Sequence, residues 1–297
     1  MTDRAGQEAM EQTKIDTSPL SFFRFVGIAA IVFLHYGIRS NPHLTSYARA
    51  GSIIVFFYML SGFVLYLNYR RKGEVDLRQY LLKRTINILP LYYVGFIMFL
   101  AILLYMGNFS FTGFFLSLFC LQAWVPGYQH YINPPSWFVS GLLFFYLLFP
   151  MMFSRITRTS PGPGRLLAGG LCLWVLTIVI LNGVFNPAAF SGYFLDYFDF
   201  IESFPLANFS SFYLGICGAY YVTENRGKDR ADNSLMSILG TLSVLVLFVL
   251  TLTIHYHQGI GDFMKVRLPY EAGLYAPCLL YTSPSPRDAT SHLVCRL

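Results

Sequence analysis

The sequence predicts an all-α, polytopic membrane protein with about seven spans and one additional short re-entrant or interfacial helix. The composition is 55% hydrophobic and 12% charged, whereas soluble domains usually carry about 25% charged residues. The mean hydropathy is +0.51. Several apolar stretches also approach the roughly 20 residues that cross about 30 Å of hydrocarbon. The bilayer is therefore expected to be the main solvent of this chain.

Seven apolar segments, each rich in Leu, Ile, Val, Phe and Tyr, are candidates for the spans. In chain order they are residues 20–38, 52–69, 88–106, 137–153, 166–184, 206–222 and 235–256. The segment 111–125 (FTGFFLSLFCLQAWV) is apolar but shorter, so it predicts the re-entrant or interfacial helix. Residues 1–19 are polar and lack the apolar core of a signal peptide, so the first span is expected to stay in the mature protein.

The basic residues predict the orientation of the chain. The net charge is +6, and these charges gather in loops rather than in one continuous patch, which argues against a nucleic-acid partner. Positive-inside topology places the basic loops 70–87, 154–165 and 223–234 in the cytoplasm, whereas 107–136 and 185–205 contain no Lys or Arg. This alternation holds only if 111–125 is not a span. It predicts a multi-pass membrane protein with a cytoplasmic N-terminus. The plasma (inner) membrane is the expected location.

Neither the cysteines nor the C-terminal tail suggests a site. The five cysteines show no metal-type spacing, and we predict no metal site and no disulfide framework. Residues 278–297 change abruptly to a mixture rich in Pro, Ser and Thr. This tail is either an ordinary disordered terminus or non-native sequence appended to an incomplete gene. The expected membrane domain is therefore residues 20–277, preceded by a cytoplasmic tail at 1–19.

Two ionisable residues interrupt the first predicted span, SFFRFVGIAAIVFLHYG at 21–37. Arg24 and His35 are eleven residues apart, which puts them on one helix face about 16 Å apart. Arg24 could simply snorkel at the cytoplasmic end, and His35 could lie at the outer interface. Because ionisable groups inside a span are costly and often functional, both could instead line one path.

Further motifs follow at regular places in the chain: IIVFFYMLSGFVL at 53–65, YLLKRTINILPLYY at 80–93, PPSWFVSGLLFFYLLFP at 134–150 and FPLANFSSFYLGICGAYY at 204–221. Together with Arg24 and His35, their order and spacing resemble the acyltransferase 3 family. These proteins are integral-membrane O-acyltransferases that acylate sugars and other cell-surface acceptors. The resemblance covers about residues 20 to 222.

The resemblance implies an acyl-CoA donor, most often acetyl-CoA, and a hydroxyl acceptor on a cell-surface glycan or another extracytoplasmic molecule. His is suited to take the hydroxyl proton near neutral pH, so His35 is the predicted catalytic residue, as a base or as an acyl carrier. Arg24 is expected to hold the thioester or pantetheine region. Arg84, with Lys83, is expected to contact the donor phosphates, although both charges could merely set the topology.

The element at 134–150 supplies candidate substrate contacts. Trp137 and Ser136 could meet a sugar ring or belong to an interfacial aromatic belt, and Tyr146 could line the cavity or the core. Ser61 and Gly62 are expected to serve helix packing. Membrane lipid is a further expected partner, and any protein that completes acyl transfer outside the membrane is expected to be a separate chain.

Three positions depart from the family pattern. Asn87 stands where a second arginine is usual, Leu142 where a glutamate is usual, and Ser211 where an acidic residue is common. The family usually has about ten helices, so the chain is also expected to be truncated at its C-terminus. Two alternatives therefore stay open: a transporter or flippase for a lipid-linked sugar, or an inactive truncated family member.

Overall fold

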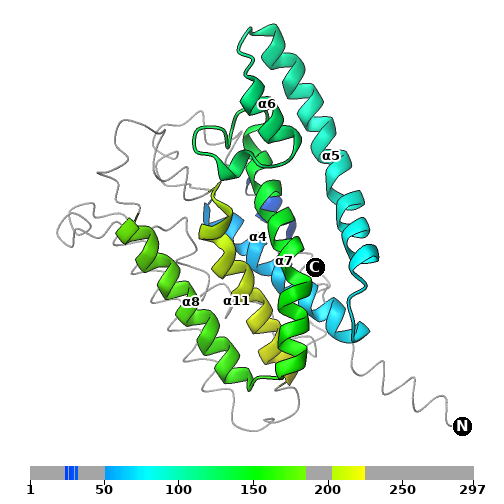
Figure 1. Ribbon diagram of the computed structural model, residues 1–297, viewed down its shortest axis with the longest axis vertical. Coiled ribbons are helices and arrows are strands. Elements are labelled where there is room, and N and C mark those ends of the chain that lie inside the picture. Colours follow the sequence, from blue (N-terminus) through cyan, green and yellow to red (C-terminus); the bar gives the residue numbers. More distant parts are fainter. Residues whose placement is uncertain (1–23, 26, 30, 33–50, 185–202, 225–297) are drawn as a thin grey trace, which may run out of the picture. The chain divides into compact units, whose positions relative to one another are not determined.

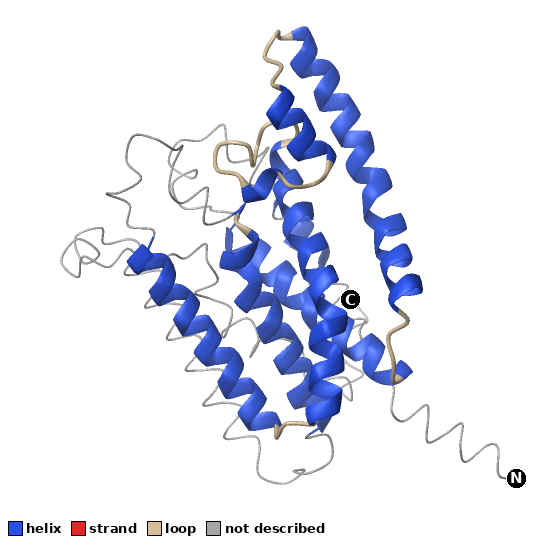
Figure 2. Cartoon of the chain, viewed as in Figure 1, coloured by secondary structure: helices blue, strands red, loops and turns tan. Residues whose placement is uncertain are grey.

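The computed structural model describes residues 24–25, 27–29, 31–32, 51–184 and 203–224 of the 297-residue chain. These residues form helices and their connections, with no strand among them (Figure 2). The all-α prediction is therefore confirmed. The described residues before 33 are helical and belong to a different compact unit from those after 50. His35 and the predicted span 235–256 lie outside the described residues.

The second unit is described as a series of α-helices joined by short connections and 3-10 turns (Figure 1). The elements are α4 (Gly51–Lys72), α5 (Leu77–Tyr105), α6 (Phe111–Leu118), η1 (Gln122–Trp124), η2 (Pro134–Ser136), α7 (Trp137–Thr159), α8 (Pro163–Val184) and α11 (Pro205–Glu224). Among the described residues, three helices are long and apolar enough to cross a membrane, namely α5, α7 with the η2 turn before it, and most of α8. Within α4, Ile54–Arg70 is a shorter apolar stretch.

The segment 111–125 does not form a long helix. Its N-terminal part is α6, which has 8 residues and therefore a length of about 12 Å. Ser110 caps this helix by accepting a hydrogen bond from the backbone N–H of Gly113. The chain turns at Cys120, whose φ is 57°, before the short η1 turn. These features agree with the prediction of a short helix rather than a span.

Two predicted loops are wrong in length, because the helices continue past the apolar core. The helix α5 begins at Leu77 instead of 88 and α7 continues to Thr159 instead of 153. The Asp76 carboxylate caps α5 by accepting from the N–H groups of Arg78 and Gln79. Lys and Arg are good helix formers. Their charges therefore show where a helix leaves the membrane but not where the helix ends.

The core of the second unit lies where α4, α7 and α11 meet. A Cβ added at Gly62 would overlap the carbonyl oxygen of Phe212, and one at Gly215 would overlap that of Met59. These glycines let the backbones of α4 and α11 approach closely, as small residues do between membrane helices. The predicted packing function of Gly62 is thus confirmed. From α7, Phe145 stacks on Phe212 with ring centroids 5.0 Å apart.

Candidate functional site

A hollow of about 300 Å³ lies where the C-terminal end of α4 approaches the first turns of α5. It is lined by Asn68, Tyr69, Lys72, Lys83 and Arg84. Three of these side chains are cationic, and none of the described lining residues is acidic. The hollow is therefore an electropositive site to which two different helices contribute, and anionic groups are the ligands that it favours.

The short connection between the two helices brings their charges together. The backbone turns at Gly73, whose φ is +80°, a conformation that glycine adopts at little steric cost. Asp76 then starts α5 by capping it. Because α5 is already helical at Leu77, Lys83 and Arg84 are fixed on its second turn instead of lying in a loop. Figure 1 shows α4 leading directly into α5 through this turn.

The Arg84 side chain lies against two tyrosine rings. Its guanidinium carbon is 5.7 Å from the ring centroid of Tyr80 and 5.4 Å from that of Tyr146, both within the range of a cation–π contact. Tyr80 lies four residues before Arg84 and therefore on the same helix face. The Tyr80 hydroxyl donates to the backbone carbonyl of Tyr146 at 2.9 Å, which fixes the ring that Arg84 covers and ties α5 to α7.

Arg84 has donor capacity left over. Its Nε atom is buried and has no hydrogen-bond partner, and the residue as a whole is half-buried. A buried donor without a partner typically costs about 1–3 kcal/mol, and more if it is charged. The planar guanidinium matches phosphate and carboxylate oxygens and Arg84 lines the hollow, so an anionic ligand there is a suitable partner for this side chain.

The wall supplied by α4 is also aromatic and basic. Tyr69 is buried and meets Tyr80 edge to face, with centroids 5.4 Å apart. The Lys72 Nζ atom lies 5.4 Å from the centroid of the Tyr69 ring, while the side chain stays exposed at the rim. Sequence reasoning had used Lys72 only as a topology charge and had not singled out Asn68, Tyr69 or Tyr80. That these residues lie around one hollow follows only from the packing of α4 against α5.

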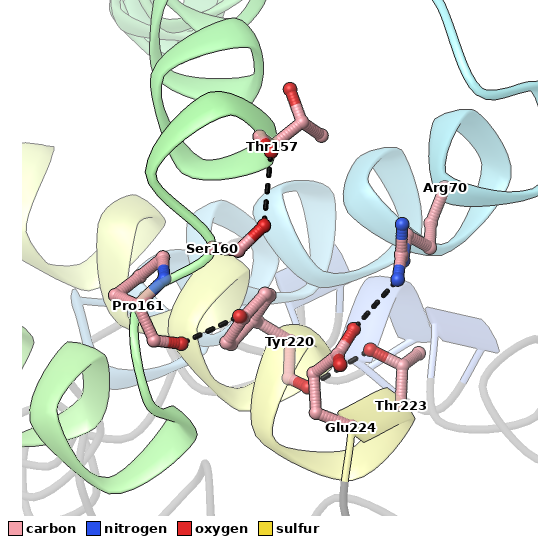
Figure 3. A network of polar contacts seen from close by, with 7 residues as sticks. All are labelled: Arg70, Thr157, Ser160, Pro161, Tyr220, Thr223 and Glu224. Carbon is pink, nitrogen blue, oxygen red and sulfur yellow. Dashed lines mark hydrogen bonds and ion pairs between the residues drawn. The ribbon is translucent and has the colours of Figure 1, made fainter.

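Polar contacts hold the C-terminal end of α4 to the end of α11 (Figure 3). Arg70 Nη2 lies 2.8 Å from Glu224 Oε1, which joins α4 to the end of α11. The Tyr220 hydroxyl of α11 donates at 2.6 Å to the carbonyl of Pro161, in the turn between α7 and α8. The ends of α4 and α11 and the turn between α7 and α8 are thereby tied together.

Trp137 and Ser136 lie apart from the basic hollow, at the start of α7. Nine residues separate Trp137 from Tyr146, or about 13.5 Å along the helix. The Ser136 hydroxyl donates to the carbonyl of Asn133 at 2.6 Å and accepts from Gln122 Nε2 at 3.2 Å. Trp137 is buried. The structure therefore brings Lys83, Arg84 and Tyr146, from the middle of α7, together and leaves Trp137 and Ser136 apart from them at the start of α7.

The remaining sequence candidates have the following positions. Arg24 is helical and half-buried in the first unit. Asn87 is exposed on α5 and is not among the lining residues of the hollow, whereas Leu142 and Ser211 are buried. Within the part of the chain that the structure describes, no group of three His, Cys, Asp or Glu side chains could hold a metal ion.

Comparison with known proteins identifies the family. A family model described as an acyltransferase domain matches residues 20–282. The chain belongs to the acyltransferase 3 family. The resemblance drawn from the sequence motifs is therefore confirmed, and membership supports membrane O-acyltransferase activity in general. No curated protein and no solved structure shows significant similarity to the chain.

Proposed function

We propose that this family member transfers an acyl group, most often acetyl, from cytosolic acyl-CoA to a hydroxyl of a cell-surface glycan or another extracytoplasmic acceptor. The observation that carries the donor assignment is the hollow lined by the three cations Lys72, Lys83 and Arg84, with no acidic residue among its described lining. CoA carries phosphates that need fixed cations. An acyltransferase-family chain with such a cationic hollow is best explained as a CoA-dependent enzyme.

The proposed topology agrees with this donor. Positive-inside orientation would put the N-terminus, the turn between α4 and α5, and the hollow on the cytoplasmic side of the plasma (inner) membrane. Acyl-CoA is dissolved on that side, so its phosphates would stay at the hollow while its thioester reaches into the membrane domain. The proposed membrane domain is residues 20–277, and any protein that completes transfer outside the membrane would be a separate chain.

The proposed chemistry is acyl transfer from a thioester to a hydroxyl. His35 would take the proton of the acceptor hydroxyl as its oxygen attacks the thioester carbonyl, and the C–S bond then breaks. The proton leaves with the CoA sulfur, so the products are the ester and CoA. If His35 instead carries the acyl group, its ring nitrogen attacks first and the acceptor oxygen second. Arg24 would hold the thioester or pantetheine region in either route.

Substrate contacts are proposed for the middle and the N-terminal end of α7. Tyr146, in the middle of the helix, has its ring against Arg84 and would belong to the donor side. Trp137 and Ser136 lie about 13.5 Å away at the start of the helix, and we assign this turn to the acceptor side. Trp137 is buried, so only the edge of its indole would be available to a sugar ring.

The test is transfer of radiolabelled acetyl from acetyl-CoA to surface glycans in cells or vesicles that contain the chain. Wild type is compared with His35→Ala and with the control Arg158→Ala at matched membrane abundance. Arg158 is exposed on the last turn of α7 and is not among the residues that line the hollow. The proposal expects incorporation in wild type and in Arg158→Ala, and its loss in His35→Ala.

Two outcomes contradict the proposal. Absence of incorporation in abundant wild-type protein would contradict acyltransferase activity toward these acceptors. If His35→Ala changed the movement of a lipid-linked sugar across the membrane and left acetylation unchanged, the transporter alternative would replace it.

A further inference from the structure

The hollow has two walls that differ in depth. Arg84, on the α5 wall, is half-buried and its Nε is fully enclosed. Lys72, on the α4 wall, is exposed and covers the ring of Tyr69. A ligand that fills the hollow therefore meets Arg84 deep in the site and two exposed cations, Lys83 on the α5 wall and Lys72 on the α4 wall. This arrangement favours a ligand with more than one anionic group.

We infer that Lys72 binds a second phosphate of the donor, on the nucleotide side of the phosphate that Arg84 holds. The inference rests on the proposed use of acyl-CoA. The pantetheine arm must run toward the buried end of the site, so the phosphate next to it would meet Arg84. The phosphates of the nucleotide are then left for the exposed ammonium of Lys72, which can follow them with three rotatable donors.

The position of Asn87 gives this inference a second basis. Asn87 is one turn beyond Arg84 on α5, is exposed and is not among the residues that line the hollow. The α5 wall therefore supplies its cations only through Lys83 and Arg84 among the described lining residues. The additional cation at the rim comes from another helix, at Lys72, which lies twelve residues before Arg84 in the sequence. The donor grip thus joins α4 and α5.

The test is equilibrium binding of CoA and of 4′-phosphopantetheine to the purified full-length chain in detergent or in neutral-lipid nanodiscs. The second probe keeps the pantetheine and one phosphate but lacks the nucleotide. Lys72→Gln is expected to weaken CoA binding about tenfold, the size of one charge-assisted contact at an exposed position. It should leave the affinity for 4′-phosphopantetheine within about twofold of wild type.

Three variants serve as controls. Arg84→Gln should weaken the binding of both probes, because Arg84 meets the phosphate that both contain. Arg78→Gln removes an equal charge from an exposed position of α5 that is not among the lining residues, and it should change neither affinity. Lys72→Arg should restore most of the affinity for CoA.

Each contrary result has a distinct meaning. If Lys72→Gln leaves CoA binding unchanged while Arg84→Gln weakens it, the inference is overturned and the proposed donor stands. Equal weakening of both probes by Lys72→Gln would overturn the assignment to a second phosphate. If wild type does not bind CoA but binds phosphatidylglycerol through Lys72, the hollow is a lipid-headgroup site, and both the inference and the donor assignment fail.

Discussion

The middle of α4 packs closely against another helix, whereas its C-terminal end lines an open hollow. In the middle, Gly62 brings the backbone against α11, and a Cβ there would meet the Phe212 carbonyl. At the end, Asn68 and Lys72 are exposed and line a hollow of about 300 Å³. Close packing in the middle leaves no room for a ligand but fixes the helix, and this fixed helix presents its basic end to α5. One helix therefore supplies both a structural interface and a binding wall.

The largest effect is expected from adding a side chain at the close contact between α4 and α11. Gly62→Ala should destabilise the protein by about 1–3 kcal/mol, because the added methyl group meets backbone rather than a side chain that can turn away. Thermal stability in detergent, followed by fluorescence-detected size exclusion, measures the change. Gly169→Ala on α8 is the matched control, since its Cβ would meet nothing within 4 Å. Equal melting temperatures for the two variants would contradict the close α4–α11 contact.

The next effect separates binding from folding. Arg84→Lys keeps the charge but removes the planar group that lies against Tyr80 and Tyr146, so we expect the KM for acetyl-CoA to rise about tenfold. Thermal stability should stay within about 1 kcal/mol of wild type. The acetyl-transfer assay gives KM, and a lower melting temperature with an unchanged KM would show that Arg84 serves the fold rather than the donor.

A smaller effect is expected from the hydrogen bond that fixes the Tyr80 ring next to Arg84. Tyr80→Phe keeps the ring but removes the hydrogen bond from its hydroxyl to the carbonyl of Tyr146, at a cost of about 0.5–1.5 kcal/mol. The KM for acetyl-CoA should also rise a few fold as the guanidinium loses its fixed support. Tyr105→Phe, at a position that is 93% exposed, should change neither quantity. If Tyr80→Phe changed neither stability nor the KM, ring packing alone would orient Arg84.

The smallest effect is expected at the ion pair between α4 and α11. Arg70 and Glu224 are partly exposed, and such pairs contribute about 0–1 kcal/mol. A double-mutant cycle with Arg70→Gln and Glu224→Gln should give a coupling energy in this range that decreases as salt is added. A coupling energy well above 1 kcal/mol that is insensitive to salt would instead make this contact a principal support of the α4 end.

Much of the fold was accessible from the sequence because burial in lipid demands long apolar helices. The spans predicted at 52–69 and 166–184 match α4 and α8 closely, and the short segment after 110 was recognised by its length. The start of α5 was missed because an apolar window cannot detect a helix that continues into water. The cap at Asp76 was the available signal for that start.

The sequence by itself determined the helical membrane class, the family and the chemical character of Arg84, since composition and motif spacing are properties of the chain. Only the tertiary structure decided that Arg84 shares a hollow with Lys72 and an aromatic contact with Tyr146, while Trp137 and Ser136 lie elsewhere. The reason is that hydropathy is a property of each segment by itself. A site depends instead on how different helices are connected, how each is rotated about its axis and how closely they pack.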